Sequence, residues 1–113
     1  MQKKNLKINE IFALAVQNHR RNNLKVAKNL YEKILKINPN HFETIFSLGV
    51  LLTKTKSFDL AKQLLQTAIQ IKPDHANAHN NLGIVFQELK EFQKAKNCYE
   101  KAIQIDPDHA PTH

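Results

Sequence analysis

The feature that most constrains this chain of 113 residues is a period of 34 residues that runs through most of it. Shifting the sequence by one period superimposes identical residues at several positions in three successive units. Among them are Leu14, Leu48 and Leu82; Ala27, Ala61 and Ala95; Ile37, Ile71 and Ile105; Pro39, Pro73 and Pro107; and His41, His75 and His109. A fixed period of this length indicates a repeat architecture, in which each unit buries its apolar face only by stacking on its neighbours.

Within each unit, apolar residues recur at spacings of three and four in two segments, as on the buried face of an α-helix. The first stripe of the first unit consists of Ile11, Leu14, Ala15 and Asn18, in a helix that we expect to open at Lys7 or Ile8. A polar turn separates the two segments, and the prolines end the second. The residues after the prolines, Asn40, Asp74 and Asp108, are expected to be the N-caps of the following helices. The sequence predicts six helices and no strand.

The third unit carries a resemblance to a known family. Its Leu-Gly pair at Leu82, followed by Phe86, Ala95, Tyr99, Ala102 and Pro107, resembles the tetratricopeptide repeat, or TPR. The resemblance covers residues 8–109 in three units, 8–41, 42–75 and 76–109, with 1–7 as a basic lead-in and 110–113 as the start of a truncated fourth repeat. It implies an all-α fold, a right-handed α-solenoid of three helix-turn-helix units. It also implies a non-catalytic scaffold that binds a protein or peptide.

Two glycines lie inside predicted helices, where glycine costs about 1 kcal/mol relative to alanine. Gly49 and Gly83 are one period apart, and Ala15 holds the same place in the first unit. This pattern favours a need for a small residue where the paired helix approaches closely, near Ala61 and Ala95, over a need for a positive φ.

The net charge of +7 is uneven along the chain. Residues 1–7 carry +3, the first unit +4, the second +1 and the third −1. A basic end attracts acidic partners, so weak nucleic-acid binding through it is an alternative function. It is the less favoured one, because the sequence lacks a basic stripe interleaved with stacking aromatic residues.

Several classes of protein are excluded or disfavoured. The single cysteine, Cys98, excludes an internal disulfide and suits a reducing compartment, so we expect a cytoplasmic protein. There is no apolar run of membrane-spanning length and no signal peptide, so we expect no membrane partner. No base is positioned to activate Cys98, and no phosphate-binding loop is present, so we expect neither an enzyme nor a cofactor.

The histidines invite a metal-site hypothesis, which we do not favour. Three of them lie one repeat apart, and stacked helices are about 8–10 Å apart, too far for three rings to share one ion. The pairs His75/His79 and His109/His113 have a chelating spacing, but neither has an evident third ligand. We expect no metal and assign these histidines to turns and helix starts.

In TPR arrays the first helix of each unit lines a concave groove, so the resemblance implies that partners bind there. Four apolar residues of these helices have no evident partner in their own unit and are predicted to anchor a ligand, although the alternative is that they pack against one another. They are Phe12, Val16, Phe46 and Val50. The other residues predicted to line the groove are Asn9, Arg20, Ser47, Lys54, Asn77, Asn80, Asn81, Ile84 and Gln87.

Two TPR subclasses bear on the ligand. The subclass that clamps a chaperone's C-terminal carboxylate uses Lys, Arg and Asn at places that here hold Phe12, Val16, Ser47, Asn77 and Asn81, so its basic set is absent. The Ala-His-Asn-Asn-Leu-Gly stretch is similar to arrays attached to O-glycosyltransferases and some sulfotransferases, whose groove asparagines hold peptide backbone. Only Asn81 matches them. A substrate-docking part of such a larger enzyme is therefore a further alternative function.

The outer side of the third unit has no further helix to cover it in this sequence. We expect either that the chain is cut from a longer protein, which is the favoured alternative, or that another molecule covers this side. Val85, Leu89, Tyr99 and Ile103 are predicted to lie on this edge and to drive self-association into a homo-oligomer.

Overall fold

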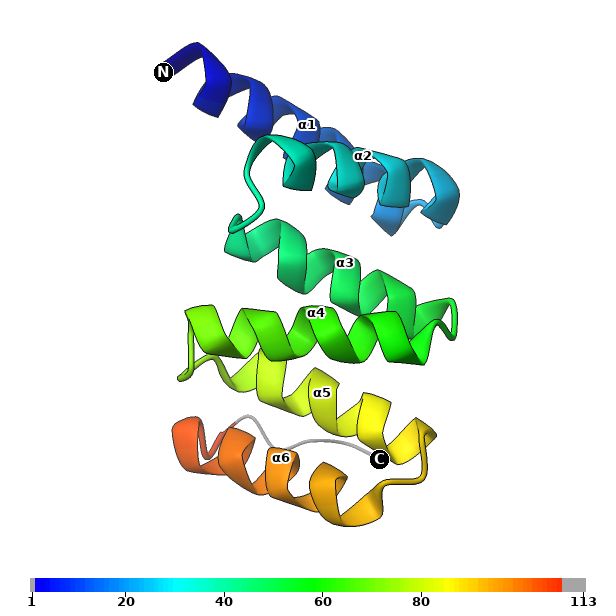
Figure 1. Cartoon of the computed structure of the whole chain (residues 1–113), viewed down its shortest axis with the longest axis vertical. Helices are drawn as coiled ribbons and strands as arrows, with labels where there is room; N and C mark the ends of the chain where they lie inside the picture. Colours follow the sequence, from blue (N-terminus) through cyan, green and yellow to red (C-terminus); the bar gives the residue numbers. More distant parts are fainter. Residues whose placement is uncertain (1, 109–113) are drawn as a thin grey trace.

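The computed structural model describes residues 2–108, and within them it contains six α-helices and no strand. The helices stack one below another along the long axis of the molecule (Figure 1). In chain order they are α1 (Gln2–Arg20), α2 (Leu24–Ile37), α3 (Phe42–Lys54), α4 (Phe58–Ile71), α5 (Ala76–Glu88) and α6 (Phe92–Ile105). The expected start of a fourth repeat, 110–113, and His109 lie outside the described residues.

Each odd-numbered helix packs against the even-numbered helix that follows it, and the three pairs then stack in order. The loops between pairs lie along one edge of the array and the turns within pairs along the other (Figure 1). In the described chain α3 also touches α5 directly, whereas α1 and α3, α2 and α4, and α4 and α6 make no comparable contact. Following the predicted groove, α1, α3 and α5 are called the inner helices and α2, α4 and α6 the outer helices.

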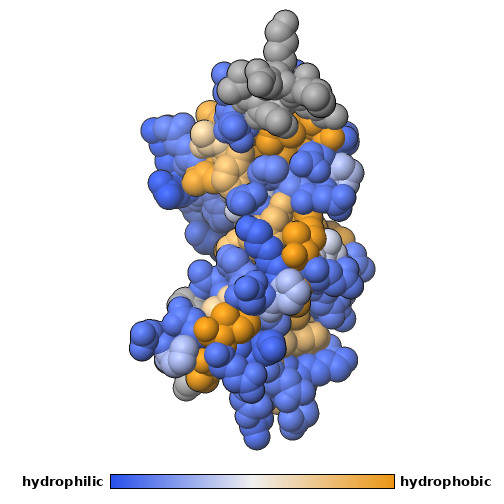
Figure 2. Space-filling model, turned by 90° about the vertical axis from the view of Figure 1, so that its left-hand side faces the viewer, coloured by the Kyte–Doolittle hydropathy of each residue, from blue (hydrophilic) through white to orange (hydrophobic). Residues whose placement is uncertain are grey.

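The core follows the repeated small and large residues. Ala27, Ala61 and Ala95 are buried, and so are the large side chains of Tyr31 and Leu65 in the same cluster. On the loop-bearing edge, the apolar residues form separate patches among hydrophilic ones (Figure 2).

One predicted core residue is not buried. Leu14 is 48% exposed, although Leu48 and Leu82, its equivalents in the later repeats, are 4% and 5% exposed. The reason is positional, because Leu48 and Leu82 are covered by the preceding helix pair and α1 is the first helix described. The sequence pattern identified the repeat position correctly but overestimated its burial in the first repeat.

Both glycines occupy the close approach that the sequence predicts. A Cβ atom on Gly49 would lie 2.9 Å from Leu65 Cγ, and one on Gly83 would lie 2.7 Å from the ring of Tyr99. Neither glycine has a positive φ. The small residue is therefore required by the paired helix, with Leu65 and Tyr99 as the neighbours rather than Ala61 and Ala95.

The turns within pairs repeat one backbone geometry. Asn22, Lys56 and Lys90 have φ values of 66°, 66° and 64°, at the same place in the three repeats. One residue later, the N–H of Asn23 donates to Asn18 O at 2.8 Å, and the other two turns make the same bond. This left-handed residue with a bond spanning five residues is a common way to end a helix.

The starts of three helices differ from the prediction. Helix α1 begins at Gln2 rather than at Lys7 or Ile8. The N-caps of α3 and α5 are His41 and His75, each one residue after the predicted caps. In the first loop the Asn40 N–H donates instead to Asn38 Oδ1 at 3.1 Å, which closes a turn before the helix begins.

Candidate partner-binding surface

The side chains predicted to line the groove come from α1, α3 and α5, and none of them is buried. They form rows, because residues one period apart hold equivalent places on successive helices. One row is aromatic and then amide, with Phe12, Phe46 and Asn80; the next is aliphatic, with Val16, Val50 and Ile84. A third row consists of Arg20, Lys54 and Glu88, all of which repeat position also predicts to face the groove.

Phe12 is held by two aromatic neighbours. Its ring centre lies 6.1 Å from that of Tyr31 and 5.7 Å from that of His41, the latter in an edge-to-face arrangement. Both neighbours belong to its own repeat, so the expectation that Phe12 lacks a partner there is wrong. Phe12 is half-buried, with part of its surface left for a ligand.

Phe46 has an equivalent set of neighbours in the second repeat. Its ring is parallel to that of Phe42 with centres 6.1 Å apart, and the His75 ring lies 5.0 Å from both. The expectation of no partner is therefore wrong for Phe46 as well. Fixed aromatic rings that remain partly exposed are suited to anchoring a ligand side chain, because little freedom is lost on binding.

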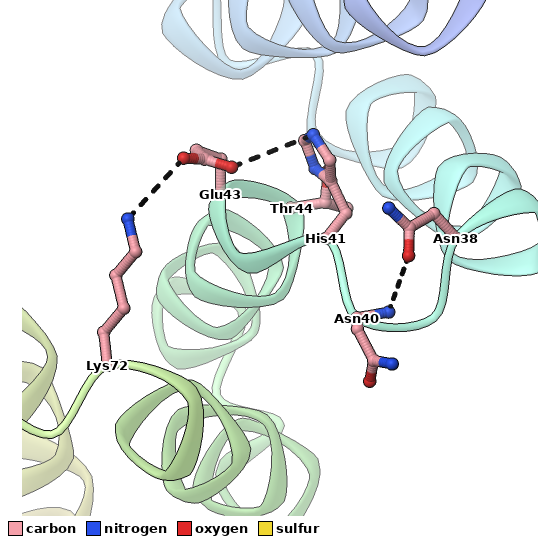
Figure 3. Close-up of polar contacts among 6 residues, drawn as sticks. All are labelled: Asn38, Asn40, His41, Glu43, Thr44 and Lys72. Carbon is pink, nitrogen blue, oxygen red and sulfur yellow. Dashed lines mark hydrogen bonds and ion pairs between the residues drawn. The ribbon is translucent and has the colours of Figure 1, made fainter. Parts of the chain in front are cut away.

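A short chain of charged groups lies at the loop side of this aromatic cluster (Figure 3). The Glu43 carboxylate lies 3.9 Å from Lys72 Nζ and 3.8 Å from His41 Nε2. The Lys72 ammonium also lies 4.4 Å from the centre of the Phe42 ring. These contacts connect the two inter-repeat loops across α3 and hold the rim of the groove at this edge.

His75 and His79, at the start of α5, make hydrogen bonds with the backbone. The Ala78 N–H donates to His75 Nδ1 at 3.1 Å, so this nitrogen carries no proton. Burial lowers the pKa of His75, and the positive charge of Lys72 lowers it further. His79 Nε2 donates to Pro73 O at 2.7 Å. Among the described residues no three His, Cys, Asp or Glu side chains gather as a metal site would require, and His109 and His113 lie outside that part.

Tyr31 connects the first two repeats below the groove. It is fully buried, and its hydroxyl lies 3.1 Å from His19 Nδ1. Burial raises the pKa of Tyr31, and a hydrogen bond with the Ser47 side chain partly opposes this. The pKa of His19 is lowered by burial and then by the positive charge of Lys54. The predicted groove residue Ser47 thus lies near this core residue.

The amides of the third repeat are arranged differently from the expectation. Asn81 Nδ2 donates to Asn77 O, within its own helix, at 2.8 Å. A peptide that bonded to this amide nitrogen would have to compete with that bond, although the Asn81 oxygen is not used by it. Asn80 Oδ1 has no hydrogen-bond partner among the described residues.

The predicted self-association edge is smaller than expected. Val85 has no exposed surface and lies in the core cluster, so it does not belong to this edge. Tyr99 is half-buried and donates its hydroxyl to Gln87 Oε1 at 2.7 Å. Ile103 is 42% exposed, and Leu89 is partly buried. Burial raises the pKa of the neighbouring Cys98 to about 11, which keeps the thiol protonated and poorly nucleophilic at neutral pH.

Two hollows flank the first repeat. One, of about 490 Å³, lies at the end of α1 beside Val16 and is lined by Arg20 and Arg21. The other, of about 310 Å³, lies between α2 and α4 on the outer side, with Leu48, Leu52, Leu60, Leu64, Lys28, Glu32, Gln63 and Thr67 around it. Sequence reasoning missed the second hollow. The signal was present in Leu52, because the larger Phe86 occupies the equivalent place in the next repeat.

Comparison with known families decides the class of protein. One model of the tetratricopeptide repeat matches residues 76–109, and another matches residues 19–80, more than half of the chain. The chain belongs to the tetratricopeptide repeat family. The predicted all-α solenoid of TPR units is confirmed. TPR folds commonly mediate protein–protein interactions and are generally non-catalytic.

Solved TPR structures superimpose closely. MamA from Desulfovibrio magneticus RS-1 has a TM-score of 0.86 at 24% identity, covering 90% of this chain and 58% of that one. A mutant O-GlcNAc transferase from Thermobaculum terrenum has a TM-score of 0.92 at 23% identity, over 96% of this chain and 21% of that one. YrrB, a TPR protein with an unusual peptide-binding site, has a TM-score of 0.85 at 25% identity, over 90% and 53%.

The chain thus spans between about a fifth and three fifths of the length of these solved proteins. A comparison with curated proteins gave no significant match. Within the described residues, no helix is both long enough and apolar enough to cross a membrane.

Proposed function

We propose that this TPR array binds a peptide segment or helix of a partner protein in its concave groove. The single observation that supports this most is the pair of fixed, half-buried aromatic residues on the inner helices, Phe12 and Phe46. Each is positioned by a histidine of the following loop, at 5.7 Å for His41 and 5.0 Å for His75. Their exposed edges provide apolar contact area in line with the row formed by Val16 and Val50.

The proposed ligand inserts apolar side chains between these aromatic and aliphatic rows. Asn80 lies next in the aromatic row, and its unpaired Oδ1 is able to accept a backbone N–H of the ligand once the side chain turns outward. Affinity then comes mainly from the first two repeats, and the amides of the third repeat set the register of the peptide.

The test begins with a phage-displayed library of random dodecapeptides selected against the wild-type chain. Recovered peptides are titrated by calorimetry against Phe46→Ala. Truncating a central aromatic anchor typically costs about 2 kcal/mol, so we expect binding to weaken about thirtyfold.

The matched control is Phe92→Ala, since Phe92 is 62% exposed and begins α6, away from the inner helices. We expect it to bind like the wild type, as should Lys36→Ala and Lys62→Ala on the outer helices. Circular dichroism would confirm that each variant is folded. Equal affinity of Phe46→Ala and the wild type, together with loss of binding in the lysine variants, would show that the outer basic surface is the binding site.

Self-association is a second candidate function, and one observation favours it. Ile103 on α6 is 42% exposed, although Leu35 and Ile69, its equivalents in the earlier repeats, are partly buried against the following helix pair. We propose that a second copy of the chain covers this position, together with Leu89 and the exposed part of Tyr99.

A further inference from the structure

The last residues of the three inner helices form a row of charges that changes sign. Helix α1 ends at Arg20, α3 at Lys54 and α5 at Glu88, and the three are one period apart. Each follows the aliphatic row by one helical turn, so a ligand lying on Val16, Val50 and Ile84 passes beside this row. The first two positions are basic and the third is acidic.

Helix stability explains the basic residues but not the acidic one. The C-terminal end of a helix carries partial negative charge, which favours cations and disfavours anions there. Arg20 and Lys54 are therefore favourable where they are, whereas Glu88 is unfavourable at the last residue of α5. Helix stability therefore does not account for the acidic residue at this groove position.

No internal partner accounts for these charges either. The ion pairs in the described part of the chain involve His41, Glu43, Lys72, Glu91 and Lys94, and none involves a member of the row. All three side chains are exposed. The hollow beside Val16 and Arg20, about 490 Å³ in volume, leaves room for a ligand side chain next to the guanidinium group.

We propose that the groove binds a polypeptide segment with a matching charge pattern, in which acidic side chains face Arg20 and Lys54 and a basic side chain faces Glu88. This proposal rests on the groove being the partner-binding surface. The apolar side chains of the segment lie on the aliphatic row, and its charges pair along the rim, where they fix the direction of the segment and reject the reversed one. A uniformly acidic polymer, such as a nucleic acid, does not fit, because Glu88 repels it.

The test compares two sets of charge changes that are equal in net charge. The inverted variant carries Arg20→Glu, Lys54→Glu and Glu88→Lys. The matched control carries Lys33→Glu, Lys36→Glu and Glu32→Lys, all at exposed positions of the outer helix α2. The random dodecapeptide library is selected in parallel against the wild type, the inverted variant and the control.

We expect the wild type and the control to select peptides with acidic residues toward one end of an apolar segment and a basic residue toward the other. The inverted variant should select the opposite signs. A wild-type peptide should bind the inverted variant at least tenfold more weakly, and the same peptide with its charges exchanged should recover the affinity.

Other results would overturn this inference in distinguishable ways. The selected peptides could lack a charge pattern and still lose binding to the Phe46→Ala variant. That result would contradict the role of the charge row but would support the groove as the binding site. If the wild type enriches no peptide, both proposals fail. The wild type could instead select uniformly acidic peptides, which the Glu88→Lys variant binds more tightly. The ligand would then be a polyanion without a charge pattern, and RNA would be tested next.

A single change covers the case in which the inverted variant does not fold. Glu88→Lys alone should raise the melting temperature, because it removes an unfavourable charge from the end of α5. The same change should weaken binding of wild-type-selected peptides at least threefold. A variant that is more stable and binds equally well would contradict the proposal.

Discussion

At the scale of single residues, Gly83 of α5 lies directly against the ring of Tyr99 on the paired helix α6. A Cβ on Gly83 would lie 2.7 Å from Tyr99 Cε1 and 2.9 Å from Cδ1. The Tyr99 ring is not free to move aside, because its hydroxyl donates to Gln87 at 2.7 Å. The Tyr99–Gln87 hydrogen bond therefore requires a residue without a Cβ at position 83.

We expect Gly83→Ala to lower the free energy of unfolding by about 1 kcal/mol. Overpacking of a well-packed contact costs about 1–3 kcal/mol, and the higher helix propensity of alanine returns about 1 kcal/mol of that. Urea denaturation followed by circular dichroism measures the change.

The control is a double-mutant cycle with Tyr99→Leu. When the ring is absent, Gly83→Ala should become neutral or stabilising, because only the propensity difference remains. If Gly83→Ala is already stabilising in the wild-type background, the steric explanation for this glycine is wrong.

At the scale of the helix and turn, Lys90 is a residue in an unfavourable conformation. Its φ of 64° lies in the left-handed region, where the Cβ atom crowds the backbone. Glycine is the usual residue at this place in a helix C-cap, and asparagine is the next best, as at Asn22 in the first turn. The second and third turns thus use a lysine where the backbone favours a residue without a Cβ.

We expect Lys90→Gly to raise the free energy of unfolding by about 0.5 kcal/mol, because relief of the Cβ contact exceeds the added freedom of the unfolded chain. Thermal unfolding measures it. The same substitution at Lys96, an exposed position inside α6, should instead cost about 1 kcal/mol. Equal destabilisation by both changes would contradict this account of the turn.

The sequence predicted these elements in part. The period and the apolar stripes predicted the number, the order and the type of the helices, because those features depend on repeated local patterns. The N-caps at His41 and His75 were missed, because histidine is not among the preferred N-cap residues. The His75 ring accepts from the Ala78 N–H, whereas the His41 ring contacts the Thr44 side chain and makes no cap bond to the backbone of α3. The exposure of Leu14 was missed for a different reason, since burial depends on the next helix pair rather than on the repeat position.

The groove could also be predicted only in part. Repeat position placed all the predicted residues on the inner helices. The packing of Phe12 against Tyr31 and of Phe46 against His75 could be seen only in three dimensions, because the partner rings come from other elements. The change from basic to acidic residues at Glu88 was visible in the sequence. Only the structure shows that Glu88 is the last residue of α5, where a negative charge is unfavourable.

At the scale of the whole molecule, the two ends of the array expose one large aliphatic residue each, Leu14 at 48% and Ile103 at 42%. We expect association through the α6 end, with the same surface on both chains, so sedimentation velocity at rising concentration should show a dimer. Ile103→Lys should shift it toward monomer, because burying an ammonium is unfavourable. Ile103 suits this test better than Tyr99, whose contacts also hold α5 and α6 together.

Leu14→Lys is the control, since it places the same charge on a residue of similar exposure at the other end. It should leave the dimer intact. If Leu14→Lys dissociates the oligomer instead, and the wild type forms oligomers of steadily increasing size, then the chains associate end to end. A strict monomer at all concentrations would end the self-association proposal.

The outer hollow between α2 and α4 and the aromatic row on α1 and α3 are two sides of one junction. The junction between the second and third repeats has Phe86 where this one has the smaller Leu52. We expect a small molecule bound in this hollow to spread α2 from α4 and to change the distance between Phe12 and Phe46 on the opposite side.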